Sequence, residues 1–157
     1  MKKKDIEALI LWYETNKRDL PWRHTKDPYK IWISETMLQQ TRVDTVIPYY
    51  ERFLKEIPDL KALANIDEDR LLKLWEGLGY YSRARNLQKT AQILQSQNQN
   101  TLPIDKLALQ SLPGIGPYTV GAILSIAYGL REPAIDGNVL WVLSRVYEEK
   151  ESILKPK

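Results

Sequence analysis

Apolar residues recur at helical spacing along almost the whole chain, and proline or glycine interrupts the pattern at short intervals. No stretch alternates with a period of two over the length of a strand, so the sequence predicts an all-helical fold. The first expected helix contains residues 6–13 and stops before Pro21, and a short loop follows at 21–26. Further helices are expected at 28–38, 43–56, 60–64, 68–77, 82–96, 104–112, 117–130 and 137–149, with Asp27 capping the first of these and a frayed end at 95–100.

Length and charge restrict the class of protein. The 157 residues suffice for one domain with a sizeable core, and the net charge of +3 is compatible with a polyanionic partner without establishing one. No apolar run approaches the roughly 18 residues of a membrane span, and the N-terminus leads into an amphipathic helix, so we expect a cytoplasmic protein. With no cysteine and one histidine, we expect no disulfide and no metal site within these residues.

Residues 112–117 read as a tight turn that runs directly into an apolar helix. Gly114 and Gly116 can adopt positive φ and let a ligand approach the main chain, while Pro117 suits the first position of a helix. The free N–H groups at such a helix start favour a phosphate. The ordinary alternative is a turn between two helices. The second glycine and the proline-started helix favour a clamp for a nucleic-acid backbone.

Two carboxylates are candidates for chemistry. Glu35 lies in the middle of an expected helix among apolar and neutral residues, an environment expected to raise its pKa and suit a general acid. Spacing alone favours the ordinary alternative, a solvent-facing glutamate. Asp136 stands at the start of the last expected helix, where an aspartate is commonly just an N-cap. Two carboxylates in different surroundings are what cleavage of a glycosidic bond requires, although sequence cannot show that they face each other.

Two further stretches could contact bases. Residues 39–41 close the helix of Glu35 with amide side chains, and residues 77–83 place aromatic side chains on a mobile glycine corner. Amides can hydrogen-bond base edges and an exposed tyrosine can wedge into a base stack, although for either stretch alone the ordinary reading is favoured. Together with two weak signals in the loop at 21–26, the candidate DNA contacts are Trp22, Arg23, Gln39, Gln40, Thr41, Leu78, Tyr80, Gly114 and Gly116.

Five motifs follow one another in a specific order, at 21–23, 33–41, 75–83, 112–118 and 136–139. In this order the chain resembles MutY-type adenine DNA glycosylases from about residue 6 to residue 146. The resemblance implies the helix-hairpin-helix glycosylase fold, with two helical lobes flanking a DNA cleft. One lobe would comprise 22–131, the other 1–21 and 132–157, in a single catalytic domain that is incomplete at its C-terminus.

The resemblance also implies roles for individual residues. Glu35 resembles the acid that protonates adenine and later handles the water, Asp136 the carboxylate that stabilises the sugar cation, and Asn138 a polar group beside it. Tyr118 occupies the position at which strand-cutting members carry a nucleophilic lysine. A phenol cannot form a Schiff base, so we expect a monofunctional glycosylase.

The remaining matches concern recognition of DNA. Gln40 and Tyr80 match positions that wedge into the duplex beside the lesion pair, and Trp22 and Arg23 a loop near the adenine pocket. The expected partner is double-stranded DNA with adenine opposite 8-oxoguanine or guanine, with the base extruded for cleavage. No membrane and no obligate protein partner is expected.

The chain departs from the family pattern in its second half. Most members carry a 4Fe–4S cluster on four later cysteines, which would lie after Lys157. Trp141 stands where cluster-bearing members usually have arginine; it favours a clusterless relative, or is a packing substitution. The resemblance also implies a domain that recognises 8-oxoguanine, which we expect to be missing from these residues. Apolar residues of the first and last helices would then lack part of their cover, so we expect lower stability or self-association.

Two functions of different class remain open at this point. The first is an adenine glycosylase catalytic domain, and the second is a truncated, non-catalytic helix-hairpin-helix module that only binds DNA. The presence of both Glu35 and Asp136 favours the first, because a pure binder needs no such pair. A related glycosylase for another mismatched base is a third, weaker alternative.

Overall fold

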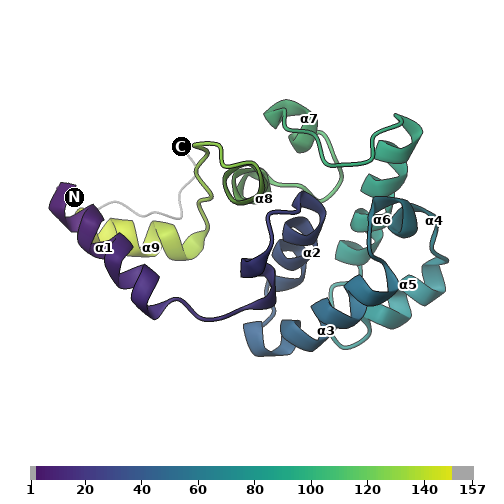
Figure 1. The fold of residues 1–157 in the computed structure, drawn as a ribbon, viewed down its shortest axis with the longest axis horizontal. Helices are drawn as coiled ribbons and strands as arrows, with labels where there is room; N and C mark the ends of the chain where they lie inside the picture. The colour runs from purple at the N-terminus through teal and green to yellow at the C-terminus, as the bar shows by residue number, and fades with distance from the viewer. Residues whose placement is uncertain (1–2, 150–157) are drawn as a thin grey trace. The chain divides into compact units, whose positions relative to one another are not determined.

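The structure, a computed structural model, describes residues 3–149. Leu20–Ala134 forms one compact unit, here called the central unit. The two ends of the chain, up to Asp19 and from Ile135, form the other, the terminal unit. Within residues 3–149 all regular structure is helical and no strand occurs, which confirms the all-α prediction (Figure 1).

Aspartate caps fix where several helices of the central unit begin. Asp27, Asp59, Asp67 and Asp105 each accept a hydrogen bond from a backbone N–H two or three residues further on. Such caps satisfy donors that the first helical turn leaves without partners. The elements of the central unit are η1 (Pro21–His24), α2 (Pro28–Leu38), α3 (Val43–Glu56), α4 (Leu60–Asn65), α5 (Glu68–Trp75), α6 (Ser82–Ser96), α7 (Lys106–Gln110), α8 (Pro117–Ala122) and η2 (Ile123–Ala127).

Helix α2 is the centre of this unit. Every residue from Ile31 to Met37 is buried, because α2 packs against α3, α6, α8 and η2. Figure 1 shows α2 between α8 on one side and α6 on the other. A helix surrounded in this way is apolar on nearly all faces, as the sequence of α2 is. Any polar side chain in its middle is therefore held inside the protein.

Several predicted boundaries were wrong, including the ends of the helices expected at 68–77 and 137–149, which stop at Trp75 and Val146. The expected loop at 21–26 contains a 3₁₀ turn, η1, and the helix expected at 104–112 is restricted to α7, which begins only after the Asp105 cap. The helix expected at 117–130 changes after Ala122 into a π-helical turn, η2, in which the Tyr128 amide donates to the Ile123 carbonyl five residues earlier. Glycine at 121 allows the backbone of Pro133 to approach α8, since a Cβ there would lie 2.1 Å from the Pro133 carbonyl oxygen.

The terminal unit consists of α1 (Lys3–Asn16) and α9 (Gly137–Val146), and neither helix contains a buried residue. Large apolar side chains are exposed on both helices, among them Leu9, Leu11, Trp12, Trp141 and Val142. Lower stability or self-association of the chain stays a prediction. None of the helices in residues 3–149 is long and apolar enough to cross a bilayer.

Candidate functional site

The two hairpin glycines differ in backbone conformation. Gly114 has a φ of +74°, and a Cβ at this position would lie 2.9 Å from the Asn86 Cβ. Only glycine fits here without strain. Gly116 has a φ of −84°, so the expectation of a positive φ was wrong for this residue; it is the N-cap of α8, and a Cβ would meet no atom within 4 Å. The space beside Gly116 is open to an approaching ligand.

The turn itself is firmly held in the protein. Ile115 is buried, its amide donates to the Leu112 carbonyl, and the Thr90 hydroxyl donates to the Pro113 carbonyl over 3.0 Å. Gly114, Gly116 and Pro117 are exposed. The hairpin therefore presents a rigid strip of small residues and main chain at the surface, as a clamp for a nucleic-acid backbone would need.

Glu35 lies inside the central unit. Its relative exposure is 9%, so the solvent-facing alternative that spacing favoured was wrong. The helix that carries Glu35 packs directly against α8, which begins at the hairpin and carries the half-buried Tyr118. A carboxyl group is thus held within the protein beside the helix that follows the hairpin.

Asp136 caps α9 in the terminal unit. Its carboxylate accepts from the Val139 amide over 2.8 Å and from the Asn138 side-chain amide over 2.9 Å. The ordinary capping role is therefore present, and the two hydrogen bonds fix the orientation of the carboxylate. Asn138 positions Asp136, as expected of a polar group beside it. Because Asp136 and Glu35 belong to different units, their joint action stays a prediction.

Gln40 and Tyr80 share an unusual backbone conformation. Both residues have a left-handed φ, 58° for Gln40 and 48° for Tyr80, and both are exposed, Tyr80 to 63%. Non-glycine residues rarely adopt this conformation, and where they do the surrounding structure must enforce it. The two expected wedges are thus held in conformations that cost energy.

Arg83 hydrogen-bonds the backbone beside both residues, and it is not among the site residues expected from the sequence. The guanidinium is buried, with 8% relative exposure, and reaches the end of α2 with one nitrogen and the glycine corner with the other. Nη1 donates to the carbonyls of Thr36 (2.9 Å), Met37 (3.0 Å) and Gln39 (2.7 Å); Nη2 donates to the carbonyls of Leu78 (3.0 Å) and Gly79 (3.1 Å) and to Thr41 Oγ1 (3.3 Å). The corner expected to be mobile is therefore anchored.

A signal in the sequence could have revealed Arg83. It stands four residues before Leu87 and eight before Ala91, on the face of α6 that carries its buried apolar residues. A cation on an apolar helix face needs acceptors inside the fold. Burial lowers the pKa of the guanidinium, and its Nε has no hydrogen-bond partner among residues 3–149.

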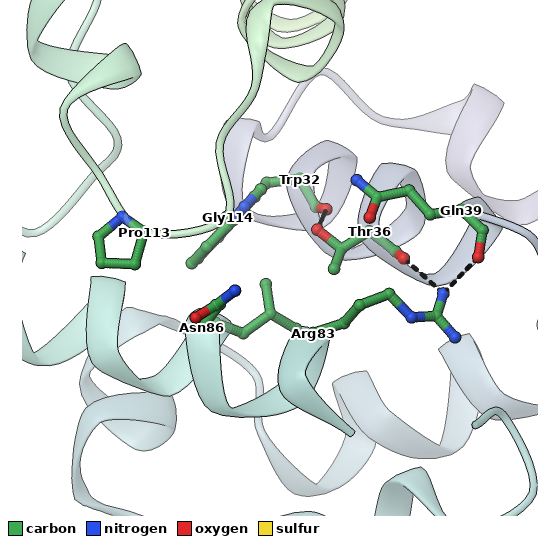
Figure 2. A pocket seen from close by; sticks show the side chains of 8 residues that line it. Trp32, Thr36, Gln39, Arg83, Asn86, Pro113 and Gly114 are labelled. Atoms are coloured by element: carbon green, nitrogen blue, oxygen red, sulfur yellow. Dashed lines mark hydrogen bonds between the residues drawn. The ribbon is translucent and has the colours of Figure 1, made fainter. Parts of the chain in front are cut away.

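Figure 2 shows a pocket between α2, α6 and the hairpin, along which the Arg83 side chain runs. The pocket is lined by Trp32, Thr36, Gln39, Arg83, Asn86, Leu87, Pro113 and Gly114. A guanidinium, two side-chain amides and a hydroxyl are among its polar side-chain groups. The pocket connects Gln39, which precedes Gln40, with the hairpin; DNA contact was predicted for both parts separately.

Two predicted contacts lie in the core instead. Trp22 is buried and packs edge-on against Tyr50, and Leu78 is also buried. Their side chains pack beneath the loop and the corner, and their contact with DNA stays a prediction. Arg23 is exposed, and Gln39 and Thr41 are half-buried beside the Arg83 guanidinium.

The residues present do not fit an iron–sulfur cluster. The chain contains no cysteine, and residues 3–149 contain no group of three or more His, Cys, Asp or Glu side chains that could hold a metal ion. Trp141 is 56% exposed, with the Arg145 guanidinium 4.9 Å from its ring. Its side chain is not packed in a core, and its bearing on a cluster stays a prediction.

Comparison with known proteins identifies the class. Residues 33–157 match the family described as HhH-GPD superfamily base excision DNA repair protein, and the chain belongs to this superfamily. It is similar to a solved thymine-DNA glycosylase structure, with a TM-score of 0.87 and 28% identity over 94% of this chain and 70% of that one. It also shares the fold of endonuclease III in a trapped DNA complex, with a TM-score of 0.81, 22% identity and coverage of 98% and 74%.

Among curated proteins, the chain is similar to adenine DNA glycosylases. It is 47% identical over 142 residues to that of Buchnera aphidicola subsp. Baizongia pistaciae, which covers 90% of this chain and 40% of the relative. It is 46% identical over 147 residues to that of Mus musculus, covering 88% and 28%. The chain thus spans well under half the length of these relatives.

Proposed function

We propose that the chain is the catalytic part of a monofunctional adenine DNA glycosylase that acts on adenine opposite 8-oxoguanine or guanine. The observation that carries this proposal is Glu35, a carboxyl group buried in the central helix beside the hairpin helix. Burying a carboxyl group costs free energy, so a buried acid at this place supports a chemical role. The similarity to adenine DNA glycosylases of bacteria and mouse supports the same substrate.

The proposed reaction is hydrolysis of the N-glycosidic bond. Glu35 donates its proton to a ring nitrogen of the extruded adenine, and the bond between the base and the sugar breaks with its electron pair moving to adenine. The Asp136 carboxylate stabilises the positive charge that develops on the sugar. Water then adds to the sugar carbon and returns a proton to Glu35. The products are free adenine and an abasic site in an intact strand.

The test is base excision from defined duplexes under single-turnover conditions. Duplexes with adenine opposite 8-oxoguanine, adenine opposite guanine and thymine opposite guanine are incubated with excess protein and then treated with hot alkali. Alkali-dependent cleavage at adenine in the first two supports the proposal. Cleavage only at thymine assigns the chain to another mismatched base, and bound but uncleaved DNA assigns it to the binding module.

The binding module is favoured by one observation. Asp136 stands on α9, in a terminal unit whose two helices contain no buried residue. Few buried contacts imply low local stability, and an Asp136 that is not held in place would leave the hairpin and the wedges able to bind DNA without excision.

Tyr118 predicts that the reaction ends with removal of the base, without cleavage of the strand. A phenol cannot form a Schiff base with the sugar aldehyde, so borohydride added during turnover is expected to trap no covalent complex. Strand cleavage should then require alkali. A known lyase of the same superfamily, treated in parallel, provides the positive control. A borohydride-trapped complex of this chain would contradict the monofunctional assignment.

The hairpin glycines predict a separation of stability from DNA affinity. Gly114→Ala should lower the free energy of unfolding by about 1–2 kcal/mol, because the left-handed backbone disfavours alanine, and its Cβ would crowd Asn86. Gly116→Ala should change stability by less than about 0.5 kcal/mol. It should nevertheless weaken DNA binding about tenfold, or 1.4 kcal/mol, because the added methyl group occupies the space for a phosphate. Chemical denaturation and fluorescence anisotropy measure the two effects. Unchanged affinity in Gly116→Ala would contradict the clamp.

A further inference from the structure

Resting on the proposed function, we propose that Arg83 is a positioning residue that locks Gln40 and Tyr80 into one rigid pair, so that they enter the duplex together beside the lesion. The Arg83 guanidinium bridges two segments, residues 39–41 and residues 78–82, and it contacts both at equivalent points. Nη1 donates to the Gln39 carbonyl over 2.7 Å, and Nη2 donates to the Gly79 carbonyl over 3.1 Å. Each acceptor belongs to the peptide bond that immediately precedes a left-handed residue.

Fixing those two peptide planes fixes the direction of both wedges. A left-handed residue relaxes readily if the preceding peptide can rotate, and a hydrogen bond to that carbonyl opposes the rotation. The neighbouring carbonyls of Met37 and Leu78 accept from the same two nitrogens and reinforce each side. At the glycine corner, the guanidinium also lies 5.7 Å from the centre of the Tyr80 ring. One side chain thus determines how both exposed residues are presented.

The chemistry of the bridge indicates positioning rather than stabilisation. Among residues 3–149 no carboxylate forms an ion pair with Arg83; its acceptors are five carbonyls and one hydroxyl. Its Nε is buried without a partner in the same part of the chain. A buried cation with an unused donor is an expensive way to hold two loops together, and apolar packing would serve stability better.

Lysine cannot replace this group. The planar guanidinium sends two nitrogens in different directions, so that it reaches both segments at once, whereas an ammonium group is a single point donor. Arg83→Lys therefore keeps the charge but removes the connection that holds the two segments to each other. The matched control is Arg85→Lys, two residues further along α6, where the arginine is exposed and pairs with Glu68.

Hydrogen exchange tests the bridge without reference to activity. In Arg83→Lys we expect backbone amides of residues 39–41 and 78–82 to exchange faster, and to do so together, while α3 keeps its protection. Arg85→Lys should exchange like the wild type. Faster exchange in only one of the two segments would show that Arg83 holds only the end of α2 or only the corner, and would contradict the coupling. Unchanged exchange in both would overturn the proposal outright.

Excision from two duplexes tests what the rigid pair is for. Arg83→Lys should lower the single-turnover rate on adenine opposite 8-oxoguanine by about 10²-fold, as expected when reacting groups are misplaced by about 1 Å. On adenine opposite an abasic-site analogue, where no partner base has to be displaced, the loss should be at least tenfold smaller. Equal losses on both duplexes would show a general structural defect and overturn the proposal.

The outcomes separate the inference from the proposed function. If the wild type excises adenine from neither duplex, the proposed function fails, and the exchange of Arg83→Lys still decides whether the two segments are bridged. If the wild type is active but both segments of Arg83→Lys exchange normally, the proposed function stands and the inference fails. Arg83→Met, which removes the charge as well, should show the same coupled exchange; should it fail to fold, Arg83→Lys alone is decisive.

Discussion

Glu35→Gln lowers the single-turnover rate of adenine excision by about 10²–10⁴-fold and leaves DNA affinity unchanged, if Glu35 is the general acid. Glutamine has the size and shape of a protonated glutamic acid but carries no acidic proton. Because Glu35 is buried in α2, a larger change of shape would disturb the core, and the amide avoids this. Rates are measured by alkali cleavage of adenine-containing mispaired duplexes, and affinities by fluorescence anisotropy.

A control variant and a stability measurement distinguish loss of the acid from loss of structure. Glu51→Gln removes an exposed carboxylate of α3 and should leave excision unaffected. Glu35→Gln should unfold cooperatively at nearly the wild-type denaturant concentration, which shows that the lost activity is not lost structure. An active Glu35→Gln would remove the acid from the mechanism, and weakened DNA binding in the same variant would point to a structural role.

Asp136→Asn is expected to reduce excision by about 10²–10³-fold while retaining the fold. The reason is that two properties of Asp136 can be separated. Asparagine caps a helix about as well as aspartate, so the bond from the Val139 amide can persist. The negative charge that would stabilise the sugar cation is lost. Single-turnover kinetics report the charge, and chemical denaturation reports the cap.

Asp136→Ala provides the counterpart. It removes both the cap and the charge, so it should lose about 1 kcal/mol of stability in addition to activity. If excision by Asp136→Asn matches the wild type and only Asp136→Ala is impaired, Asp136 is an N-cap and nothing more. That outcome would leave Glu35 without its electrostatic partner and would favour the binding module.

Local signals predicted the helices well. Asp27 and Pro117 begin helices where the sequence indicates a start, because capping and proline effects depend on a few neighbouring residues. The π turn after Ala122 was not predictable in this way. It coincides with the close approach of Pro133 to Gly121, and such a contact between separated segments leaves no periodic signal.

The site was predicted less completely than the fold. Glu35 was found as a candidate, but its burial follows from the elements packed around α2 and not from the spacing within α2. Gln40 and Tyr80 were found through motifs, whereas the hydrogen bonds beside their left-handed backbone come from Arg83, more than 40 residues from Gln40. A cation that serves two distant loops is visible only after the chain has folded, although its place on the apolar face of α6 gave a hint.

The central claim is that this chain releases adenine from mispaired DNA by means of a buried acid. Mass spectrometry of the small molecules released from a duplex with adenine opposite 8-oxoguanine, under excess protein, tests it most directly. We expect free adenine in an amount equal to the duplex with the wild-type chain, and none over the same time with Glu35→Gln. Saturated binding of the duplex without any free adenine from the wild type would contradict the claim.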